Sequence, residues 1–392
     1  MHFGLFSLLQ QRDRDKEPRQ IYKEMVDQVK LAEEVGYEIA WFAEHHFSNY
    51  CVMPSPLSII HYMAPQTSRI KLGPAVIVAP LYEPMRLIED ISVADVLSDG
   101  RLVLGFGSGY QQYEFHKFGV NLKDSKKIFN ETLELVERFM GGADSIEYDG
   151  EFIQAPETHF IVRPLQDRFD TYIAGQIFET DLQVRMAQKG HVPFVTTGWS
   201  TVEQIAATRQ KVVEAYELAG IQRDPVPFAI QVNVHVCDTD SEALEAADNV
   251  RYVRRIANSM RENYAELDGA YLIEAPAKGE VPLEEIVANT LIGSPEKVAE
   301  QLIERIQVLR PTHFNTFQAP GALPHSRVMR SIERFMTEVV PLVEAELGPL
   351  AEYGTAREAS ATLSAEKNGL DRSTVPEVTR ISLREHHCLG LP

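Results

Sequence analysis

Short segments that are almost continuously apolar alternate with segments of helical periodicity along most of this chain, and this alternation constrains the fold more than any other feature. Strands that are apolar at every position are typical of parallel sheets, because both of their faces are buried. Successive runs begin about 30 residues apart, except after the fourth and seventh, where the spacing roughly doubles. Eight strands are predicted, at residues 2–9, 38–47, 71–78, 101–107, 171–174, 194–197, 228–236 and 313–317.

The segments between these runs show the features of helices that begin and end at defined residues. In the first of them, apolar side chains from Ile21 to Val35 share one helical stripe, and Gly36 then ends the helix. In a later one, Ser294 and Pro295 provide a cap and a first helical residue before a second apolar stripe. Strand and helix are therefore expected to alternate throughout.

Eight strand and helix repeats can form a closed barrel or a doubly wound open sheet. An open sheet would favour a glycine-rich dinucleotide turn, and the cluster from Gly105 to Gly109 follows the fourth strand. It fits that turn poorly, because Tyr110 stands where a further glycine is needed. A tight exit from the strand and a ligand contact are equally good explanations of these glycines, so periodicity alone leaves both architectures open.

The two long spacings predict insertions after the fourth and seventh strands. The first insertion contains alternating residues around an Asp-Gly turn at residues 146–152, which predicts a hairpin. The second, at residues 265–292, is rich in Ala, Glu and Pro and is expected to be a mobile loop over one barrel end. Sustained apolar periodicity ends near residue 346, so we divide the chain into a barrel domain, 1–346, and a C-terminal appendage, 347–392, that is expected to be partly disordered.

Charge and cysteine content exclude several classes of partner. The formal net charge is -19, which repels phosphate backbones and anionic lipid surfaces, so neither nucleic acid nor a membrane is expected as a partner. No stretch approaches the 18 or so apolar residues of a spanning helix. The three cysteines are odd in number and far apart, which favours a reducing compartment over a disulfide framework. A cytoplasmic location is the prediction.

Glu44, His45 and His46 lie at the end of the second predicted strand, and we predict them as catalytic residues. The carboxyl ends of strands face the active-site mouth in a barrel, and an imidazole can exchange a proton near neutral pH. Only one of two adjacent histidines can face that mouth unless the strand has ended. The alternatives are two structural histidines or a metallohydrolase site, but no further ligands stand at suitable spacing, so no metal is predicted.

Several motifs, taken together and in order, resemble the bacterial luciferase-like, flavin-dependent monooxygenases. The resemblance covers about residues 1–345 and rests on the opening His-Phe-Gly-Leu-Phe, on Glu44-His45-His46-Phe47, and on the Lys-Leu-Gly-Pro-Ala-Val-Ile-Val-Ala-Pro segment from Lys71. It continues through the Arg-Leu-Ile-Glu-Asp segment at 86–90, Ser-Asp-Gly-Arg-Leu at 98–102, the glycine cluster at 105–109 and Gly-Ser-Pro-Glu-Lys-Val at 293–298.

This resemblance implies an α/β protein with a (β/α)8 TIM barrel and insertions after strands 4 and 7. It implies an enzyme that takes reduced FMN and dioxygen and, through a flavin hydroperoxide, oxygenates a small organic substrate. His45 would be the base or hydrogen-bond donor near the flavin, and His46 would support the ring or the loop. Because nothing in the chain resembles an NAD(P)H-binding module, a separate flavin reductase is expected to supply the reduced FMN.

The resemblance also places the flavin. It implies a non-prolyl cis peptide between Ala75 and Val76 beneath the isoalloxazine ring. The phosphate is expected between Ser108 and the turn that begins at Gly175, which includes Gln176 and Thr180, where backbone amides at a helix start favour an anion. Gly107 and Ser108 stand where luciferases carry a reactive cysteine and an arginine. The apolar walls are expected from Phe6, Trp41, Phe106, Tyr110 and Trp199.

Two other functions and an assembly complete the expectations. An oxidoreductase of the same fold could use a deazaflavin coenzyme for hydride transfer, although the complete Glu-His-His element argues against it. A flavin-binding protein without turnover is the second alternative. A homodimer is expected, because the resemblance places helices around 56–67 and 84–98 at a subunit interface; the apolar side chains assigned to it are Ile59, Ile60, Leu87, Ile91 and Val93.

Overall fold

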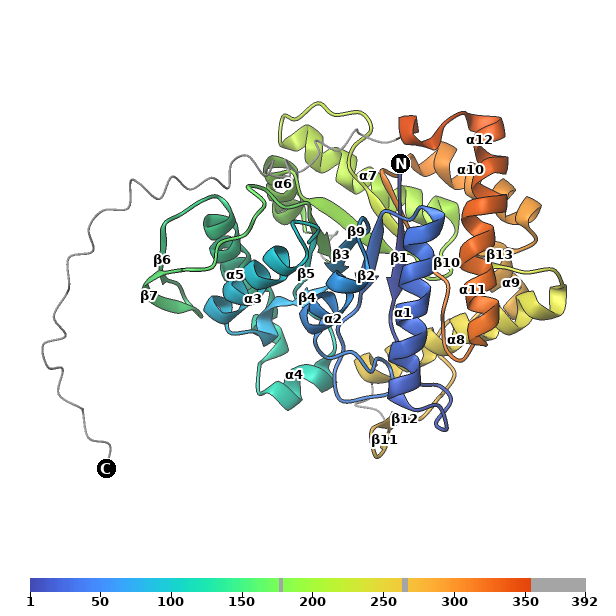
Figure 1. Cartoon of the computed structure of the whole chain (residues 1–392), viewed down its shortest axis with the longest axis horizontal. Helices are drawn as coiled ribbons and strands as arrows, with labels where there is room; N and C mark the ends of the chain where they lie inside the picture. Colours follow the sequence, from blue (N-terminus) through green and yellow to red (C-terminus); the bar gives the residue numbers. More distant parts are fainter. Residues whose placement is uncertain (176–178, 263–266, 354–392) are drawn as a thin grey trace, which may run out of the picture. The chain divides into compact units, whose positions relative to one another are not determined.

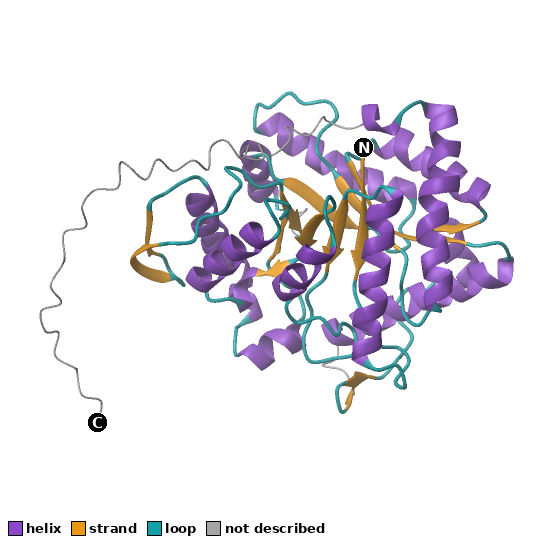
Figure 2. Ribbon diagram, viewed as in Figure 1, coloured by secondary structure: helices purple, strands orange, loops and turns teal. Residues whose placement is uncertain are grey.

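The strands of the computed structural model form a central parallel barrel with helices around it (Figure 2). The structure describes residues 1–175, 179–262 and 267–353. Neighbouring strands are hydrogen-bonded in the order β3-β2-β1-β14-β10-β9-β8-β5-β4. Their bounds are β1 (His2–Ser7), β2 (Ile39–Phe42), β3 (Lys71–Pro74), β4 (Ile77–Val78), β5 (Leu104–Gly107), β8 (Thr171–Ala174), β9 (Val192–Thr196), β10 (Ala229–Val236) and β14 (His313–Phe317).

These nine strands nearly close, and the predicted (β/α)8 barrel is confirmed. β4 is a short continuation of β3, so the nine strands correspond to the eight predicted runs. The ring is completed between β3 and the segment before β5, where Leu72 and Leu102 form a parallel bridge. Leu72 N–H donates to the Arg101 carbonyl, and Val103 N–H donates to the Leu72 carbonyl, each at 3.0 Å.

A helix follows each barrel strand and packs on the outside of the ring (Figure 1). In α1 the predicted stripe faces the core, and Gly36 ends the helix with a φ of 103°. Ser294 caps α10, as its sequence predicts. The bounds of these helices are α1 (Pro18–Val35), α2 (Pro56–Met63), α3 (Pro84–Leu97), α5 (Ser125–Met140), α6 (Thr180–Lys189), α7 (Val202–Leu218), α10 (Pro295–Leu309), α11 (His325–Arg334) and α12 (Val340–Leu347).

Trp41 fills the barrel interior and forms its floor. Its ring makes edge contacts with Tyr172 and Phe194, with centroids 4.7 and 5.5 Å apart, and its Nε1 donates to Asn315 Oδ1 at 2.8 Å. A Cβ on Gly73 would come within 2.6 Å of the indole, so a glycine is needed beside so large a ring. Trp41 and Phe106 are fully buried and absent from the cavity wall, so their assignment as flavin-facing residues was wrong.

The insertion after the fourth barrel strand contains the predicted hairpin. β6 (Ser145–Asp149) and β7 (Gln154–His159) pair antiparallel around the Asp-Gly turn, with a register shift between Ile146 and Tyr148. Before the hairpin, α4 (Gln112–Phe118) and α5 lead away from β5. Glu114, which contacts His45, lies in the first turn of α4.

The insertion after the seventh barrel strand is more regular than the predicted mobile loop at 265–292. It begins with α8 (Asp240–Glu262) and includes a small hairpin, β11 (Leu267–Asp268) with β12 (Tyr271–Leu272), then α9 (Leu283–Asn289) and β13 (Leu291–Gly293). β13 pairs with Val234–Val236, because β10 runs three residues beyond its pairing with β14. Residues 265 and 266 lie outside the described residues.

The predicted boundary at residue 346 falls within packed structure. α12 continues to Leu347, and a 3-10 turn follows at Leu350–Tyr353. Leu350 is buried, its carbonyl accepts from the Met1 ammonium at 2.6 Å, and its N–H donates to Glu344 Oε1 at 3.0 Å. The rest of the predicted appendage, 354–392, lies outside the described residues, so its partial disorder stays a prediction.

The residues assigned to a subunit interface belong largely to the chain's own core. Ile60, Leu87 and Ile91 are fully buried where α2 packs on α3, and Ile59 and Val93 are half-buried. The exposed apolar side chains on these two helices are instead Tyr62 and Leu97, at 59% and 56% exposure. Across the described ranges, no helix has the length and apolar character needed to cross a lipid bilayer.

Candidate active site

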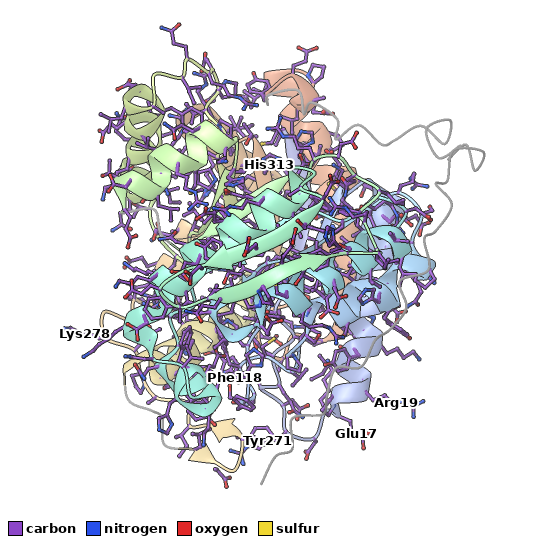
Figure 3. All side chains as sticks on the ribbon, turned by 90° about the vertical axis from the view of Figure 1, so that its left-hand side faces the viewer. Glu17, Arg19, Phe118, Tyr271, Lys278 and His313 are labelled. Carbon is purple, nitrogen blue, oxygen red and sulfur yellow. The ribbon has the colours of Figure 1, made fainter. Side chains whose placement is uncertain are left out.

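A cavity of about 580 Å³ opens at the carboxyl ends of the barrel strands. Its lining comes from segments that directly follow β2, β5, β8 and β9, together with α8. Figure 3 shows this polarity: His313, where β14 begins, lies toward one end of the barrel, and Phe118 of α4 and Tyr271 of β12 lie toward the other. Catalytic sites of barrel enzymes lie at this end, because the loops there converge.

His45 faces this cavity and is held by a carboxylate that the sequence analysis missed. β2 ends at Phe42, so His45 lies in the loop beyond it. Its Nδ1 lies 2.9 Å from Glu114 Oε1 in the first turn of α4, and Glu114 is itself buried. A carboxylate can only accept, so this bond puts a proton on Nδ1 and leaves Nε2 with the lone pair in the neutral ring.

Glu114 also fixes the loop that carries both histidines. The same Oε1 accepts the backbone N–H of His46 at 2.8 Å. One buried oxygen therefore orients the His45 ring and the backbone beside it. The sequence marks Glu114 only weakly as a site residue. Acidic residues are common in the first turn of any helix, so its place in α4 would not have singled it out.

His46 and Glu44 bind each other and join the loop to β4. His46 Nε2 lies 3.0 Å from Glu44 Oε1, and the His46 ring packs edge-on against Phe118 at 4.8 Å. Glu44 Oε2 accepts from the Tyr82 hydroxyl at 2.7 Å and from the Val78 N–H at 3.3 Å. Burial raises the pKa of Glu44, and these donors oppose that rise. His45 is part of the cavity wall and His46 is not, although both lie beyond the end of β2, where strand alternation no longer decides which side chain faces the cavity.

Two tyrosines border His45. The Tyr50 and His45 rings meet edge-on at 4.6 Å, and the Tyr110 ring lies 6.0 Å from the same imidazole. The hydroxyls of Tyr50 and Tyr110 are hydrogen-bonded to each other, and burial raises the pKa of both phenols. Both remain protonated near neutral pH, and because the bond between them uses one hydroxyl hydrogen, only one of the two hydroxyls can donate to a bound molecule.

Most of the residues predicted to contact a flavin line the cavity. The peptide bond between Ala75 and Val76 is cis, as expected. Thr180 begins α6 but is exposed and is not part of the cavity wall, and Gln176 lies outside the described residues. The predicted residues that line the cavity are Phe6, Ala75, Val76, Gly107, Ser108, Tyr110, Gly175 and Trp199, with Glu44 and His45.

The glycine cluster after β5 is explained by close packing as well as by the cavity. Gly109 has a φ of +73°, and a Cβ there would come within 2.4 Å of the Phe115 ring and 2.8 Å of Val78. Glycine is thus required both by backbone conformation and by space. Since Gly109 also lines the cavity, the two explanations left open by the sequence both apply.

Buried amides in the cavity wall fit a polar heterocycle. Within the described part of the chain, the Oδ1 of Asn233 is buried without a hydrogen-bond partner, and the fully buried Gln111 amide has no partner other than the Tyr110 hydroxyl. Both residues line the cavity, and such groups are costly unless a ligand or water satisfies them. A flavin ring edge carries both donors and acceptors. Residues 1–175, 179–262 and 267–353 contain no cluster of three or more His, Cys, Asp or Glu suited to a metal.

Sequence comparison finds relatives that align with nearly the whole chain. An uncharacterized protein, y4vJ, of Sinorhizobium fredii is 33% identical over 351 residues, covering 89% of this chain and 99% of that protein. The oxygenase component of a flavin-dependent trigonelline monooxygenase of Acinetobacter baylyi is 23% identical over 352 residues, covering 87% of this chain and 95% of its own.

Solved structures share the fold. Monooxygenase RslO1 of Streptomyces bottropensis superposes with a TM-score of 0.76 at 21% identity, over 87% of this chain and 99% of that one. The oxygenating constituent of 3,6-diketocamphane monooxygenase of Pseudomonas putida, in complex with FMN, gives 0.71 at 21%, over 88% and 98%. An F420-dependent secondary alcohol dehydrogenase gives 0.67 at 16%, over 87% and 98%. The model of the luciferase-like monooxygenase family matches residues 1–312, and this chain belongs to that family.

Proposed function

We propose that this protein is the oxygenase component of a two-component, FMN-dependent monooxygenase, in which a separate reductase supplies reduced FMN. The observation that carries this proposal is the His45 and Glu114 pair beside a large cavity at the carboxyl end of the barrel. A relative named as the oxygenase component of a flavin-dependent monooxygenase and another named as a monooxygenase support it. When bound, reduced FMN supplies the two electrons that activate dioxygen for oxygen transfer to a small organic substrate.

In this proposal His45 is the catalytic residue that exchanges a proton at Nε2. Glu114 holds the ring so that Nε2 faces the cavity, and the hydrogen-bonded pair of Tyr50 and Tyr110 has one hydroxyl left to donate beside it. Glu44 and His46, predicted as catalytic, are positioning residues, because their side chains bind each other and the segment at Val78.

The flavin ring would lie against Ala75, Val76 and Phe6, where Gln111 and Asn233 can satisfy its polar edge. Its phosphate would lie near Ser108 and Gly175, and the turn beyond Gly175 stays part of the prediction. A ring held between apolar walls excludes water from the reacting face, which favours oxygen transfer over wasteful oxidation.

A deazaflavin-dependent oxidoreductase is the second candidate, favoured by the shared fold of the F420-dependent dehydrogenase. Coenzyme preference separates the two. We expect reduced FMN to bind at least tenfold more tightly than reduced F420 under anaerobic conditions, a difference of about 1.4 kcal/mol. The opposite preference would favour the second candidate.

Turnover tests the proposal against a flavin-binding protein that lacks activity. A flavin reductase, NADH, FMN and candidate substrates are combined with the protein, and products are identified by mass after reaction under ¹⁸O₂. One ¹⁸O atom in a product is the expected result. Products without label, or product yields equal to those of the reductase alone, would contradict oxygenase activity.

We also propose a homodimer in the cytoplasm. The exposed Tyr62 on α2 and Leu97 on α3 are the apolar side chains available for a second copy. Light scattering is expected to give about twice 44.2 kDa, and Leu97→Asp is expected to shift the mass toward the monomer. The matched control is Leu218→Asp, since Leu218 is 67% exposed on α7. The wild-type protein at about 44 kDa would contradict the dimer.

A further inference from the structure

One face of α8 forms part of the cavity wall and brings two arginines to it. The α8 residues that line the cavity are Val250, Val253, Arg254, Ala257, Asn258 and Arg261. Their spacing of one, three and four residues defines a single helical face. Arg254 and Arg261 are seven residues apart, about 10 Å along the helix axis.

These two arginines differ from the other arginines nearby on the same helix. Arg251 pairs with Asp248 at 2.5 Å, and Arg255 pairs with Glu274 at 2.9 Å and Glu280 at 2.6 Å. Arg254 and Arg261 are exposed and have no carboxylate partner among the residues that the structure describes. Their guanidinium donors are therefore available to a bound molecule.

Aromatic rings hold these side chains at the cavity. The Arg254 guanidinium lies 5.8 Å from the Trp199 ring centre, and that of Arg261 lies 4.8 Å from the Tyr110 ring centre. Both rings line the cavity, so each cation lies beside a flat apolar surface. A guanidinium can remain stacked on a ring while its edge donates to a carboxylate.

Arg254 and Arg261 bring positive charge to the cavity of a strongly acidic protein. A net charge of -19 works against binding of anions, and three carboxylates already neutralise the other α8 arginines: those of Asp248, Glu274 and Glu280. Two guanidinium groups beside aromatic surfaces, without a carboxylate partner among the described residues, suit a small organic molecule with a flat or apolar body and one anionic group. A planar guanidinium fork matches the geometry of a carboxylate.

We propose that Arg254 and Arg261 bind the carboxylate of the substrate, so that the substrates of this enzyme are organic anions. The inference deepens the proposed function and rests on it. An anion could also be the phosphate of the flavin itself, which the family resemblance instead places near Ser108 and Gly175. The same chemistry therefore has two sources, and the experiment must separate them.

The test uses carboxylates and their neutral amides as probes on the full-length protein without flavin. Acetate, hexanoate and benzoate are compared with acetamide, hexanamide and benzamide by tryptophan fluorescence. The chain has two tryptophans, and Trp199 lines the cavity while Trp41 is buried in the barrel, so the titrations are repeated in Trp41→Phe, where the signal comes from Trp199. We expect at least one carboxylate to bind about tenfold more tightly than its amide, and Arg254→Ala/Arg261→Ala to abolish that preference.

The experiment also needs a control variant with the same change of charge, and a comparison of FMN with riboflavin, which lacks the phosphate. Arg19→Ala/Lys23→Ala removes the same charge from exposed positions of α1 and is expected to keep the preference. In the view of Figure 3, Arg19 lies away from Phe118, the α4 residue that packs on His46. The ratio of FMN to riboflavin affinity is expected to be equal in wild type and the Arg254→Ala/Arg261→Ala variant.

Each other outcome overturns the inference. Carboxylates that bind no better than amides would remove the anion site. An equal loss in the α1 control would assign the effect to overall charge. A lost preference for FMN over riboflavin in the cavity variant would assign the arginines to the flavin phosphate. Failure of the proposed function is seen separately, as absence of reduced-FMN binding while the carboxylate preference persists.

Discussion

The coupling between His45 and Glu114 is the most specific consequence of the site geometry. If Glu114 acts only by holding His45, its substitution cannot lower turnover further once His45 is absent. The rate losses of the two single variants then do not multiply in the double variant. His45→Ala is expected to lower turnover about 10²- to 10⁴-fold, the usual range for loss of a general acid or base. Glu114→Ala removes one charge-assisted bond to the ring, about 1.5–3 kcal/mol, which corresponds to roughly 10- to 100-fold in rate. The double variant should be no slower than His45→Ala alone.

Stability is measured in parallel, because Glu114 also accepts the buried N–H of His46. Glu114→Ala leaves that donor unpaired and should cost about 1–3 kcal/mol of unfolding free energy. Glu114→Gln is the matched control. Both bonds go to the same Oε1, so the amide oxygen can accept them, and only the charge is lost.

The assay is product formation with reductase-supplied FMN, together with urea unfolding and reduced-FMN affinity. A coupling energy equal to the Glu114→Ala loss, about 1.5–3 kcal/mol, would agree with a shared role. Rate losses that multiply, so that the double variant is slower than His45→Ala by the full Glu114→Ala factor, would refute the positioning role. Unchanged turnover, stability and affinity in His45→Ala would remove His45 from the mechanism.

Three further predictions concern stability. Gly109→Ala should destabilise the protein by about 2 kcal/mol or more, because the Cβ would meet Phe115 in a left-handed backbone, and thermal unfolding would show it; an unchanged Tm would contradict this reasoning. Burial lowers the pKa of His235 to about 4, so the unfolded chain takes up the proton first as pH falls below 6.5. About 2–3 kcal/mol of stability should be lost between pH 7 and 4.5, and His235→Gln should reduce that loss, whereas an equal loss in the variant would exclude His235. Truncation after Tyr353 should leave unfolding unchanged, while truncation after Gly348 removes buried Leu350 and should cost about 2 kcal/mol; equal Tm values for the two would contradict the packing account.

The barrel could be predicted because its strands are apolar on both faces. Residues 171–174 and 313–317 agree residue for residue with β8 and β14. The second strand was predicted through residue 47 but ends at Phe42, where its pairing with β1 and β3 stops. β13 was missed because its three residues are too few to show a period and are paired only through the extension of β10.

The site was predictable only where a local motif marks it. Glu44 and the two histidines form such a motif, and the structure brings His45 to the cavity. Glu114 is about 70 residues away, and only the path of α4 after β5 brings it to His45. Arg254 and Arg261 lie among several similar arginines, and only the face of α8 distinguishes them. The core packing of Ile60, Leu87 and Ile91 likewise depends on how α2 and α3 meet.

Binding of reduced FMN at the barrel mouth can be measured by an anaerobic titration. Quenching of Trp199 fluorescence by reduced FMN is followed in wild type and in His45→Ala. Saturable binding with a micromolar Kd, tighter than for reduced F420 and nearly equal in the two proteins, is the result that this account predicts. Absence of saturation at millimolar reduced FMN, or tighter binding of reduced F420, would contradict it.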